Sequence, residues 1–208
     1  MKPADPPDED ALRLGADVVQ RLIPHRRPLV MVDGILAYRH GARPTLWAHR
    51  HVSANEPVFD GHFPGFHLWP GVYTIEGLGQ TALLCSIVMR LVAAHEAAGG
   101  AADEVYRALR ALERAGARPS DPASGAGGPL ASLGAPDPRA GVAGHVDVKL
   151  LAPVFAGSEL RYVAVLTHQV DTLARFDVTA EVDGRPVARG TLTGALGAAI
   201  APSRIGPR

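Results

Sequence analysis

The spacing of apolar positions changes along the chain, and each spacing predicts a different element. Residues 11–23 carry apolar side chains at helical spacing and stop before a proline, so they predict a short N-terminal helix. Residues 28–41 are rich in β-branched side chains and residues 45–52 alternate in polarity, which favours two strands. From Gly71 a long stretch is apolar nearly all round, which is typical of a helix enclosed by other structure.

The C-terminal third of the chain returns to strand-like alternation. Residues 145–169, 173–184 and 185–196 alternate between apolar and polar side chains and are joined by turns that contain glycine. The step from Asp183 to Gly184 is a strong hairpin signal. Strand-rich segments on both sides of one long helix predict an α+β fold in which an antiparallel sheet curls around that helix.

Residues 95–144 interrupt this plan as an insertion. Val105, Leu109 and Leu112 share one face of a charged segment, so an amphipathic helix is expected there. The rest of the insertion is rich in Ala, Gly, Pro and Ser, and has too little apolar surface to order itself. The expected organisation is a disordered tail, a single domain that contains the insertion, and a second tail: residues 1–10, 11–200 and 201–208.

Charge and cysteine content narrow the classes of function. Lys+Arg and Asp+Glu both number 21, so the net charge is zero with histidine neutral, and we expect no nucleic acid or membrane partner. The single cysteine, Cys85, excludes an internal disulfide, fits a reducing compartment and is expected in the core. The start of the chain has no signal-peptide pattern, so we expect a cytoplasmic protein. Glu76, Gln80 and Arg90 interrupt the most apolar window, which favours a buried helix over a membrane span.

Residues 60–76, DGHFPGFHLWPGVYTIE, hold the candidate chemistry. His62 follows a glycine and precedes a proline by two positions, so the backbone can turn sharply and fix the imidazole. Histidine is the commonest general acid or base, although a lone histidine in a loop is more often structural. Here a carboxylate accompanies it, because Glu76 falls within the apolar helix that begins near Gly71.

Glu76 and the start of its helix supply two further functions. A carboxyl group in an apolar run can hold a proton and serve as a general acid, although acidic residues near a helix start also interact with the helix dipole. The helix N-terminus at Gly71 leaves free N–H groups that could bind an enolate oxygen. A base, an acid and an oxyanion site together point to proton abstraction beside a carbonyl, with loss of a leaving group.

Residues 53–80, SANEPVFDGHFPGFHLWPGVYTIEGLGQ, resemble the active-site segment of the β-hydroxyacyl-[acyl carrier protein] dehydratases, the FabZ/FabA family with the hot-dog fold. The upstream LIPHRRPLVMVDGIL and the later strands resemble that family too, so about two thirds of the chain is covered. Glutamate at position 76, and valine rather than cysteine at position 72, make the chain closer to FabZ. The matching features are Asn55-Glu56-Pro57, GHFPG at 61–65, Pro70-Gly71-Val72, Ile75-Glu76 and Gln80.

The resemblance implies a mechanism and a set of partners. His62 would take the C2 proton of a 3-hydroxyacyl thioester, Glu76 would protonate the departing hydroxyl, and the Gly71 N–H would polarise the thioester carbonyl. Gln80 would orient Glu76. The family builds each site at a dimer interface, which implies at least a homodimer, an acyl carrier protein as partner, and no metal or organic cofactor. The pathway would be fatty acid or polyketide/polyene biosynthesis.

Two departures from the family pattern bear on the substrate. After GHFPG the family usually has a small or polar residue and then proline, whereas this chain has Phe66, His67 and then Trp69. Together with Phe63 and Val72, these are candidate substrate-binding residues. The insertion is the second departure. It is either a tolerated surface loop or a lid or docking surface with basic contacts from Arg107, Arg110, Arg114 and Arg118.

Three alternatives stay open at the level of sequence. A hot-dog acyl thioesterase would also act on thioesters, although the intact GHFPG argues against it. A weakly active subunit of a heteromeric dehydratase would not need both His62 and Glu76. His49 and His51 alternate on a strand and could bind a metal, but no further ligands with a recognisable spacing accompany them, so a surface pair is favoured.

Overall fold

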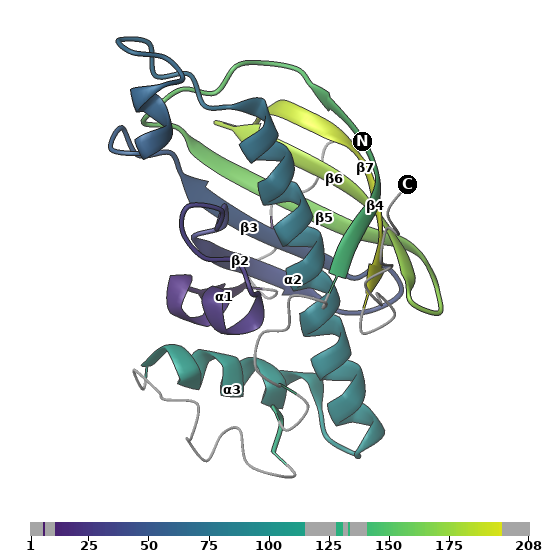
Figure 1. Ribbon diagram of the computed structural model, residues 1–208. Coiled ribbons are helices and arrows are strands. Elements are labelled where there is room, and N and C mark those ends of the chain that lie inside the picture. The colour runs from purple at the N-terminus through teal and green to yellow at the C-terminus, as the bar shows by residue number, and fades with distance from the viewer. Residues whose placement is uncertain (1–5, 7–10, 115–127, 131–132, 134–140, 197–208) are drawn as a thin grey trace, which may run out of the picture.

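The structure, a computed structural model, describes residues 6, 11–114, 128–130, 133 and 141–196, and this part of the chain forms one seven-stranded sheet. The strands in chain order are β1 (Ala11–Leu14), β2 (Gly34–Arg39), β3 (Thr45–His51), β4 (Gly141–Leu150), β5 (Glu159–Val170), β6 (Leu173–Val182) and β7 (Arg185–Leu196). Their order across the sheet is β1-β2-β3-β5-β6-β7-β4, and each neighbouring pair is antiparallel (Figure 1).

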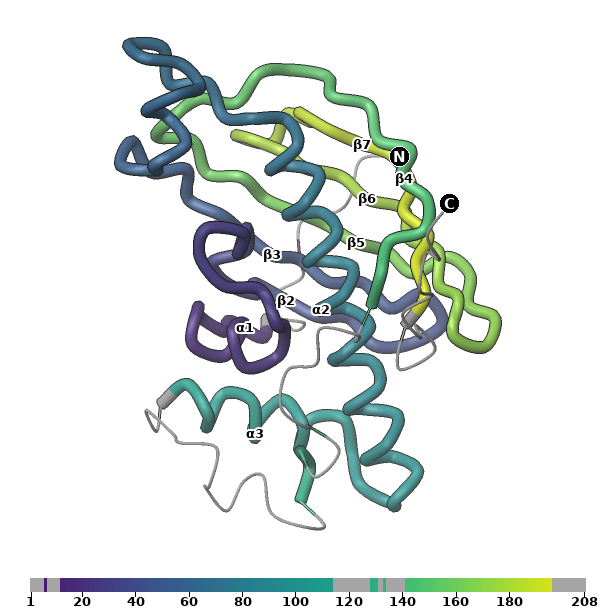
Figure 2. Tube along the Cα trace, viewed as in Figure 1, coloured from purple at the N-terminus to yellow at the C-terminus, as the bar shows by residue number. Residues whose placement is uncertain are grey.

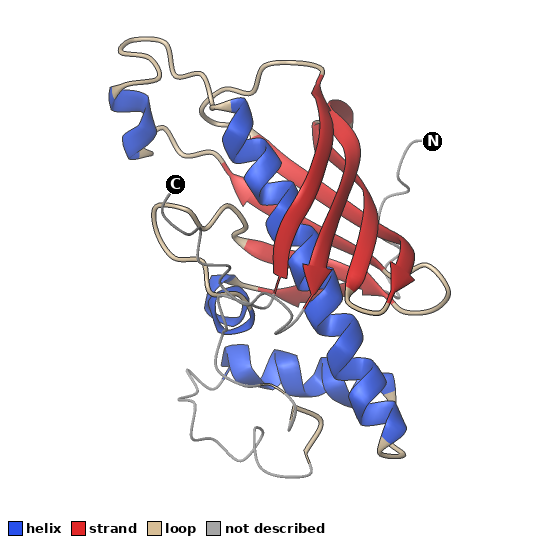
Figure 3. Ribbon diagram, turned by 45° about the vertical axis from the view of Figure 1, so that its right-hand side comes forward, coloured by secondary structure: helices blue, strands red, loops and turns tan. Residues whose placement is uncertain are grey.

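Among the described residues, four helical segments accompany the sheet: α1 (Ala16–Leu22), the 3-10 helix η2 (Pro57–Asp60), α2 (Gly71–Ala97) and α3 (Ala102–Arg114). The sheet curves around α2, as Figure 3 shows. The tube in Figure 2 shows α1 and α3 together beside the C-terminal part of α2 and the β1 end of the sheet. The α+β fold with an antiparallel sheet around one long helix, expected from the sequence, is confirmed.

Helix α2 is buried on several sides because its sequence is apolar on several sides. Leu78, Leu84, Cys85 and Val88 are each fully buried, and the helix packs against strands β3 to β7. It is long and apolar enough to cross a membrane by length and composition, yet 67% of its most apolar window is buried inside the protein. Burial of each such side chain contributes roughly 1.5–3 kcal/mol, so α2 is the centre of the core.

The first two predicted elements differ in part from the structure. Residues 11–14 form strand β1 instead of the first turn of a helix, and α1 begins only at Ala16. Leu12 and Leu14 are buried because β1 pairs with β2 and packs on α3. The predicted strand over residues 28–41 begins only at Gly34, and the backbone at Leu29 and Met31 is hydrogen-bonded to the Gln80 side chain of α2.

Helix α3 confirms the amphipathic helix expected within the insertion. Val105, Leu109 and Leu112 are buried and belong to the main core. The carboxylate of Glu104 accepts hydrogen bonds from the Ala101 N–H and from His95, which ties the start of α3 to the end of α2. Because α2 continues to Ala97 and β4 begins at Gly141, both limits of the predicted insertion lie within regular elements.

The remaining expectations for this region are tested only in part. Arg107 pairs with Asp103 on the surface of α3, and Arg110 donates to the Leu12 carbonyl of β1. Arg118, most of the Ala/Gly/Pro-rich segment and both predicted tails apart from Pro6 lie outside the described residues, as does the side chain of Arg114. The lid or docking role of the insertion therefore stays a prediction.

Strand β4 forms one edge of the sheet and is open to solvent over most of its length. Val142, Val146 and Leu150 are 47%, 48% and 53% exposed. Its inner neighbour β7 joins β6 through the predicted hairpin, in which Asp183 and Gly184 both have positive φ. A long exposed edge with apolar side chains is a surface that natural proteins usually cover.

Candidate active site

The His62 side chain is held in one tautomer by its own loop. His62 Nδ1 lies 2.8 Å from the carbonyl oxygen of Leu68. Because a carbonyl only accepts hydrogen bonds, the hydrogen of the neutral ring sits on Nδ1 and the lone pair on Nε2. The ring also stacks on Phe63, with centroids 4.2 Å apart. The loop that the Gly and Pro pattern predicted therefore presents Nε2 as a proton acceptor.

The loop that carries His62 is fixed to the connection between β4 and β5. The N–H of Trp69 donates to the Val154 carbonyl at 2.8 Å, and the N–H of Ala156 donates to the His67 carbonyl at 3.1 Å. The Trp69 side chain, 2% exposed, packs edge-on against Phe59. These contacts order a loop whose proline and glycine content excludes regular structure.

Beneath the loop lies a small group of charges. The guanidinium of Arg50 pairs with the carboxylates of Asp33 and Glu56 and lies over the ring of Trp69. Glu56 belongs to the Asn-Glu-Pro feature of the sequence, and its contact gives that feature a structural role. A half-buried arginine with two carboxylate partners avoids the cost of an unpaired charge.

Helix α2 begins at Gly71 with an open N-terminus. Pro70 precedes the first turn, and no side-chain cap is formed there by the described residues. Gly71 lies at a pocket of about 360 Å³, whose other wall comes from Leu150 to Val154 after β4. A Cβ atom at position 71 would lie 2.3 Å from Leu150 Cδ1, so glycine lets the Leu150 side chain pack closely against the start of α2.

Glu76 lies one and a half turns further along α2 and is held by Gln80. Gln80 Nε2 donates to Glu76 Oε1 at 2.9 Å, as expected from the sequence. The same amide accepts from the Met31 N–H at 2.8 Å and donates to the Leu29 carbonyl. Gln80 thus ties the carboxylate to the backbone of the segment before β2.

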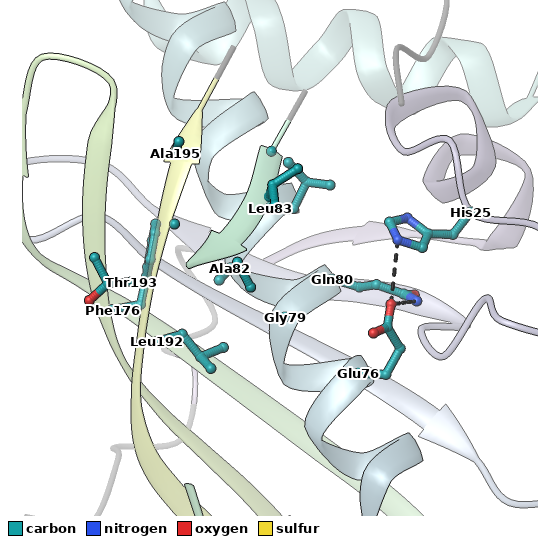
Figure 4. Close-up of a pocket in the computed structure, with 14 residues that line it drawn as sticks. His25, Glu76, Gly79, Gln80, Ala82, Leu83, Phe176, Leu192, Thr193 and Ala195 are labelled. Atoms are coloured by element: carbon teal, nitrogen blue, oxygen red, sulfur yellow. Dashed lines mark hydrogen bonds and ion pairs between the residues drawn. The ribbon is translucent and has the colours of Figure 1, made fainter. Parts of the chain in front are cut away.

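A cavity of about 170 Å³ adjoins Glu76 between α2 and strands β4, β6 and β7. His25, Glu76 and Gln80 gather on one side of it (Figure 4). The opposite side is mostly apolar and comprises Ala82, Leu83, Val142, Phe176 and Leu192. A ligand with an elongated apolar part and a polar head group fits this arrangement. The cavity within one protein chain is smaller than the roughly 300–1,000 Å³ typical of ligand pockets.

The structure brings some predicted site residues together and separates others. Glu76 and Gln80 share the cavity, whereas Gly71 lines the neighbouring pocket. His62 lines neither, and no hydrogen bond or ion pair joins it to Glu76 within the described chain. Within the described chain, His62 with its loop and Glu76 with Gln80 are two groups that neither pocket joins, and we call these groups half-sites.

The other candidate substrate-binding residues fall into two groups. Phe63, Phe66, His67 and Val72 are exposed and line neither pocket. Phe66 packs edge-on against Phe155 of the β4–β5 connection. Trp69 lines the pocket beside Gly71, but its side chain belongs to the core, so its part in the structure is mainly packing.

His25 is the site residue that sequence reasoning did not single out. Its Nε2 atom lies 3.4 Å from Glu76 Oε1. The histidine stands in the upstream segment that resembles the dehydratase family, directly after the proline that follows α1. That resemblance was the signal that could have found it, since the residue spacing alone relates it to nothing in the helix.

Two further candidates from the sequence have structural explanations. His49 Nδ1 contacts the Glu159 carboxylate at 2.8 Å and His51 Nδ1 lies 3.5 Å from the same group, which forms a surface cluster. The described residues hold no group of three or more such side chains arranged for a metal ion. Cys85 is buried as expected, and burial raises the pKa of its thiol, which makes it a poor nucleophile.

Residues 23–108 match the FabA-like domain family. Curated relatives include the 3-hydroxyacyl-[acyl-carrier-protein] dehydratase FabZ of Chlamydia trachomatis serovar L2, which is 44% identical over 77 residues, or 36% of this chain and 50% of the relative. The FabZ of Polynucleobacter necessarius is 47% identical over 66 residues, or 32% and 43% of the two chains. The chain spans about half the length of the curated relatives it matches.

Solved structures extend the likeness to most of the chain. The dehydratase heterocomplex ApeI:P from Xenorhabdus doucetiae aligns with a TM-score of 0.51 at 17% identity, over 87% of this chain and 91% of that one. Cj0977, a sigma28-regulated virulence protein from Campylobacter jejuni, aligns with a TM-score of 0.51 at 10% identity, over 92% and 93%. At these identities the likeness is one of fold.

The fold and the comparisons define the class of protein: an α+β protein with the hot-dog fold. Within it, residues 23–108 match the FabA-like domain family, and the chain is similar to FabZ dehydratases over about a third of its length. The resemblance seen in the sequence is confirmed. The matched segment contains His25, His62, Gly71, Glu76 and Gln80.

Proposed function

We propose that the protein dehydrates a 3-hydroxyacyl-[acyl carrier protein] thioester to the trans-2-enoyl thioester. One observation carries this proposal: Nδ1 of His62 contacts the Leu68 carbonyl, which leaves Nε2 available as a proton acceptor, while Glu76 is held by Gln80 at the polar side of an apolar cavity. The similarity of the matched segment to FabZ enzymes supports the same reaction. The product would serve fatty acid or polyketide/polyene biosynthesis in the cytoplasm, and an acyl carrier protein would deliver the substrate.

The roles of the three groups follow from their chemistry. His62 Nε2 removes the proton from C2, and the electrons of that C–H bond form the C2–C3 double bond. The C3–O bond breaks, and Glu76 gives its proton to the leaving hydroxyl, which departs as water. The N–H groups at the open start of α2 near Gly71 stabilise the negative charge that develops on the thioester oxygen.

The proposed site needs a second chain because one chain holds two separate half-sites. Gly141, Val142 and Ala143, at the start of β4, line the cavity beside Glu76. The far end of β4 leads into the connection to which the His62 loop is hydrogen-bonded. The ten residues of β4 span about 30 Å, so these two ends are well separated.

A second copy of the chain, related by a two-fold axis, would bring the His62 loop of one subunit close to the Glu76 cavity of the other. If the free edges of β4 pair antiparallel, the start of one β4 lies beside the end of the other. The Glu76 cavity of each chain then faces the connection that carries the partner's His62 loop. The exposed apolar residues of β4 would be covered at the same time. We therefore propose at least a dimer with two shared sites.

The test is a mass-spectrometric assay of the purified protein with 3-hydroxyacyl carrier proteins of several chain lengths. The native protein should remove water, and His62→Ala and Glu76→Gln should each reduce the rate on the order of a hundredfold or more. His168→Ala, which replaces an exposed histidine of β5, is the matched control and should keep the native rate.

Other outcomes of this assay distinguish the alternatives. Release of free thiol without loss of water would identify a thioesterase and contradict the dehydratase proposal. If the folded, isolated protein removes water from none of the 3-hydroxyacyl substrates, whatever their acyl chain length, the result would contradict a stand-alone dehydratase. Activity that appears only with a second hot-dog chain would assign the protein to a heteromeric dehydratase.

A further inference from the structure

We propose that His25 is a positioning residue for Glu76, and that it directs the acidic proton of Glu76 to Oε2. In this role the imidazole stays neutral, carries its hydrogen on Nε2 and points that hydrogen at Oε1. The proposal rests on the proposed function, because it concerns which oxygen of the general acid faces the substrate.

The contacts of Glu76 are all on one oxygen. Gln80 Nε2 donates to Oε1 at 2.9 Å, and His25 Nε2 lies 3.4 Å from the same atom. Within the described part of the chain, no hydrogen bond or ion pair involves Oε2 of Glu76. Figure 4 shows that second oxygen turned away from His25. The two oxygens of the carboxyl group are therefore in different environments.

The environment of the His25 ring selects its tautomer. His25 Nδ1 is buried and has no hydrogen-bond partner among the described residues. A hydrogen on Nδ1 would be a buried donor without an acceptor, which costs more than a bare ring nitrogen. Both the imidazolium and the Nδ1–H tautomer carry that hydrogen. The Nε2–H tautomer does not, and its hydrogen is on the ring nitrogen that lies 3.4 Å from Glu76 Oε1.

This tautomer determines where the glutamate carries its proton. When Gln80 and His25 both present N–H donors to Oε1, that oxygen can only accept. The proton of the neutral carboxylic acid must then sit on Oε2, on the side away from His25. A neutral imidazole achieves this without placing a positive charge beside the acid, which would oppose its protonation.

The backbone around His25 holds the ring in place. Gln80 binds the Leu29 carbonyl and the Met31 N–H, which fastens the end of the loop to α2. Arg26 Nη1 donates to the carbonyls of Ile23 at 2.9 Å and of His25 at 2.8 Å. These hydrogen bonds stabilise the start of the same loop. The His25 side chain is 28% exposed, so the ring is restricted without being sealed from the cavity.

The kinetic test compares His25→Ala with His25→Gln in the native and the Glu76→Gln backgrounds. Alanine removes the donor and should lower kcat on the order of tenfold with KM within about twofold, since the proposed role of His25 concerns proton transfer from Glu76 and not substrate binding. Glutamine restores an N–H and should recover kcat to within about threefold of the native value. In the Glu76→Gln background, His25→Ala should have no further effect on kcat.

Two results of the kinetic test would overturn the proposal. One is an unchanged kcat for His25→Ala. The other is an equal loss of kcat in the native and Glu76→Gln backgrounds, because an effect that survives the loss of the acid is not exerted through it. His168→Ala is again the matched control, and thermal melts of each variant show whether a loss of kcat reflects unfolding.

A second measurement needs no activity, so it separates this proposal from the proposed function. Nitrogen-15 NMR of the histidine rings distinguishes the two tautomers and the imidazolium, and the His25 signal is assigned by its absence in His25→Gln. We expect protonated Nε2 and bare Nδ1 near neutral pH, and a shift of the Nε2 resonance in Glu76→Ala. An imidazolium or an Nδ1–H tautomer would refute the proposed arrangement even if the protein is an active dehydratase.

Discussion

The two edge strands of the sheet, β1 and β4, differ in how much of each is covered by the rest of the chain. Strand β1 is four residues long, and α3 packs over it, with Arg110 donating to the Leu12 carbonyl. Strand β4 is ten residues long, and most of its residues are exposed in the described chain. One edge is closed by the chain itself, whereas the other leaves backbone groups and apolar side chains for something else to cover.

The β1 edge contributes to the stability of the domain, whereas the β4 edge adjoins the candidate active site. At the β1 end, the additional helix α3 extends the same core that surrounds α2. At the other edge, the first residues of β4 line the Glu76 cavity. The last residue of β4 leads into the β4–β5 connection, to which the His62 loop is hydrogen-bonded. The closed edge therefore stabilises the domain, and the open edge is the place where a shared active site can be completed.

The largest effect is expected at the closed edge, from Leu109→Ala. Leu109 is fully buried on the face of α3 that joins the main core. Removing a buried leucine side chain typically lowers the free energy of unfolding by about 2–5 kcal/mol. Urea or thermal unfolding should show a loss of about 3 kcal/mol, while kcat per folded molecule stays at the native value. Ala111→Ser, at an exposed position of the same helix, is the control.

The opposite result for Leu109→Ala would change the interpretation of α3. If stability is retained and dehydratase activity is lost, α3 acts on the substrate or its carrier and is not simply part of the core. That result would revive the lid or docking role that the sequence left open for the insertion.

The open edge is tested by mixing two inactive variants, His62→Ala and Glu76→Gln. Each alone should lose activity on the order of a hundredfold, or about 2.7 kcal/mol of transition-state stabilisation. In a mixed dimer with shared sites, one site combines both substitutions and the other has neither. After unfolding and refolding together, the mixture should recover about a quarter of the native activity, because half of the dimers are mixed.

The same mixture can contradict the shared site directly. If His62 and Glu76 act within one chain, no site in any mixed dimer is intact and the activity stays at the level of the single variants. Light scattering on the native protein supplies the accompanying measurement, with an expected mass of at least twice the 21.8 kDa of the chain.

The elements that the sequence predicts well are those whose signals are local. The start of α2 follows from the Pro70–Gly71 step, and its burial follows from apolar residues on all sides. The hairpin between β6 and β7 follows from Asp183–Gly184, where both residues need positive φ. The amphipathic helix α3 follows from three apolar side chains on one face. None of these required knowledge of a partner.

The parts that sequence reasoning missed depend on distant partners. Strand β1 is too short to show a recognisable alternation of apolar and polar residues. Its conformation depends on pairing with β2 and on packing against α3. His25 lies 3.4 Å from Glu76 only because Gln80 ties the intervening loop to α2. The fourteen positions between His62 and Glu76 in the sequence likewise do not reveal that neither pocket joins these two residues within the described chain.

The smallest effect is expected where α3 joins α2, through the pH dependence of the Glu104 contacts. The Ala101 N–H, which donates at 3.0 Å, and His95, at 2.7 Å, hold the pKa of the Glu104 carboxyl below its ordinary value. A lowered pKa in the folded state stabilises the protein above the unfolded value of about 4.3, and this contribution is lost as the pH falls through the lower folded value.

Urea unfolding of the native protein and of Glu104→Gln, at several pH values from 7 down to 4, measures this contribution. The native protein should be slightly more stable than the variant above about pH 5, and the difference should shrink as the solution becomes more acidic. Asp103→Asn removes the exposed pair with Arg107 and a charge in the same first turn of α3, but none of the Glu104 contacts, and serves as the control. A difference that is constant over the whole range would show that the Glu104 charge does not hold α3 to α2. α3 would then be held at the covered edge by its apolar face and by its polar contacts with Leu12 and Gly15.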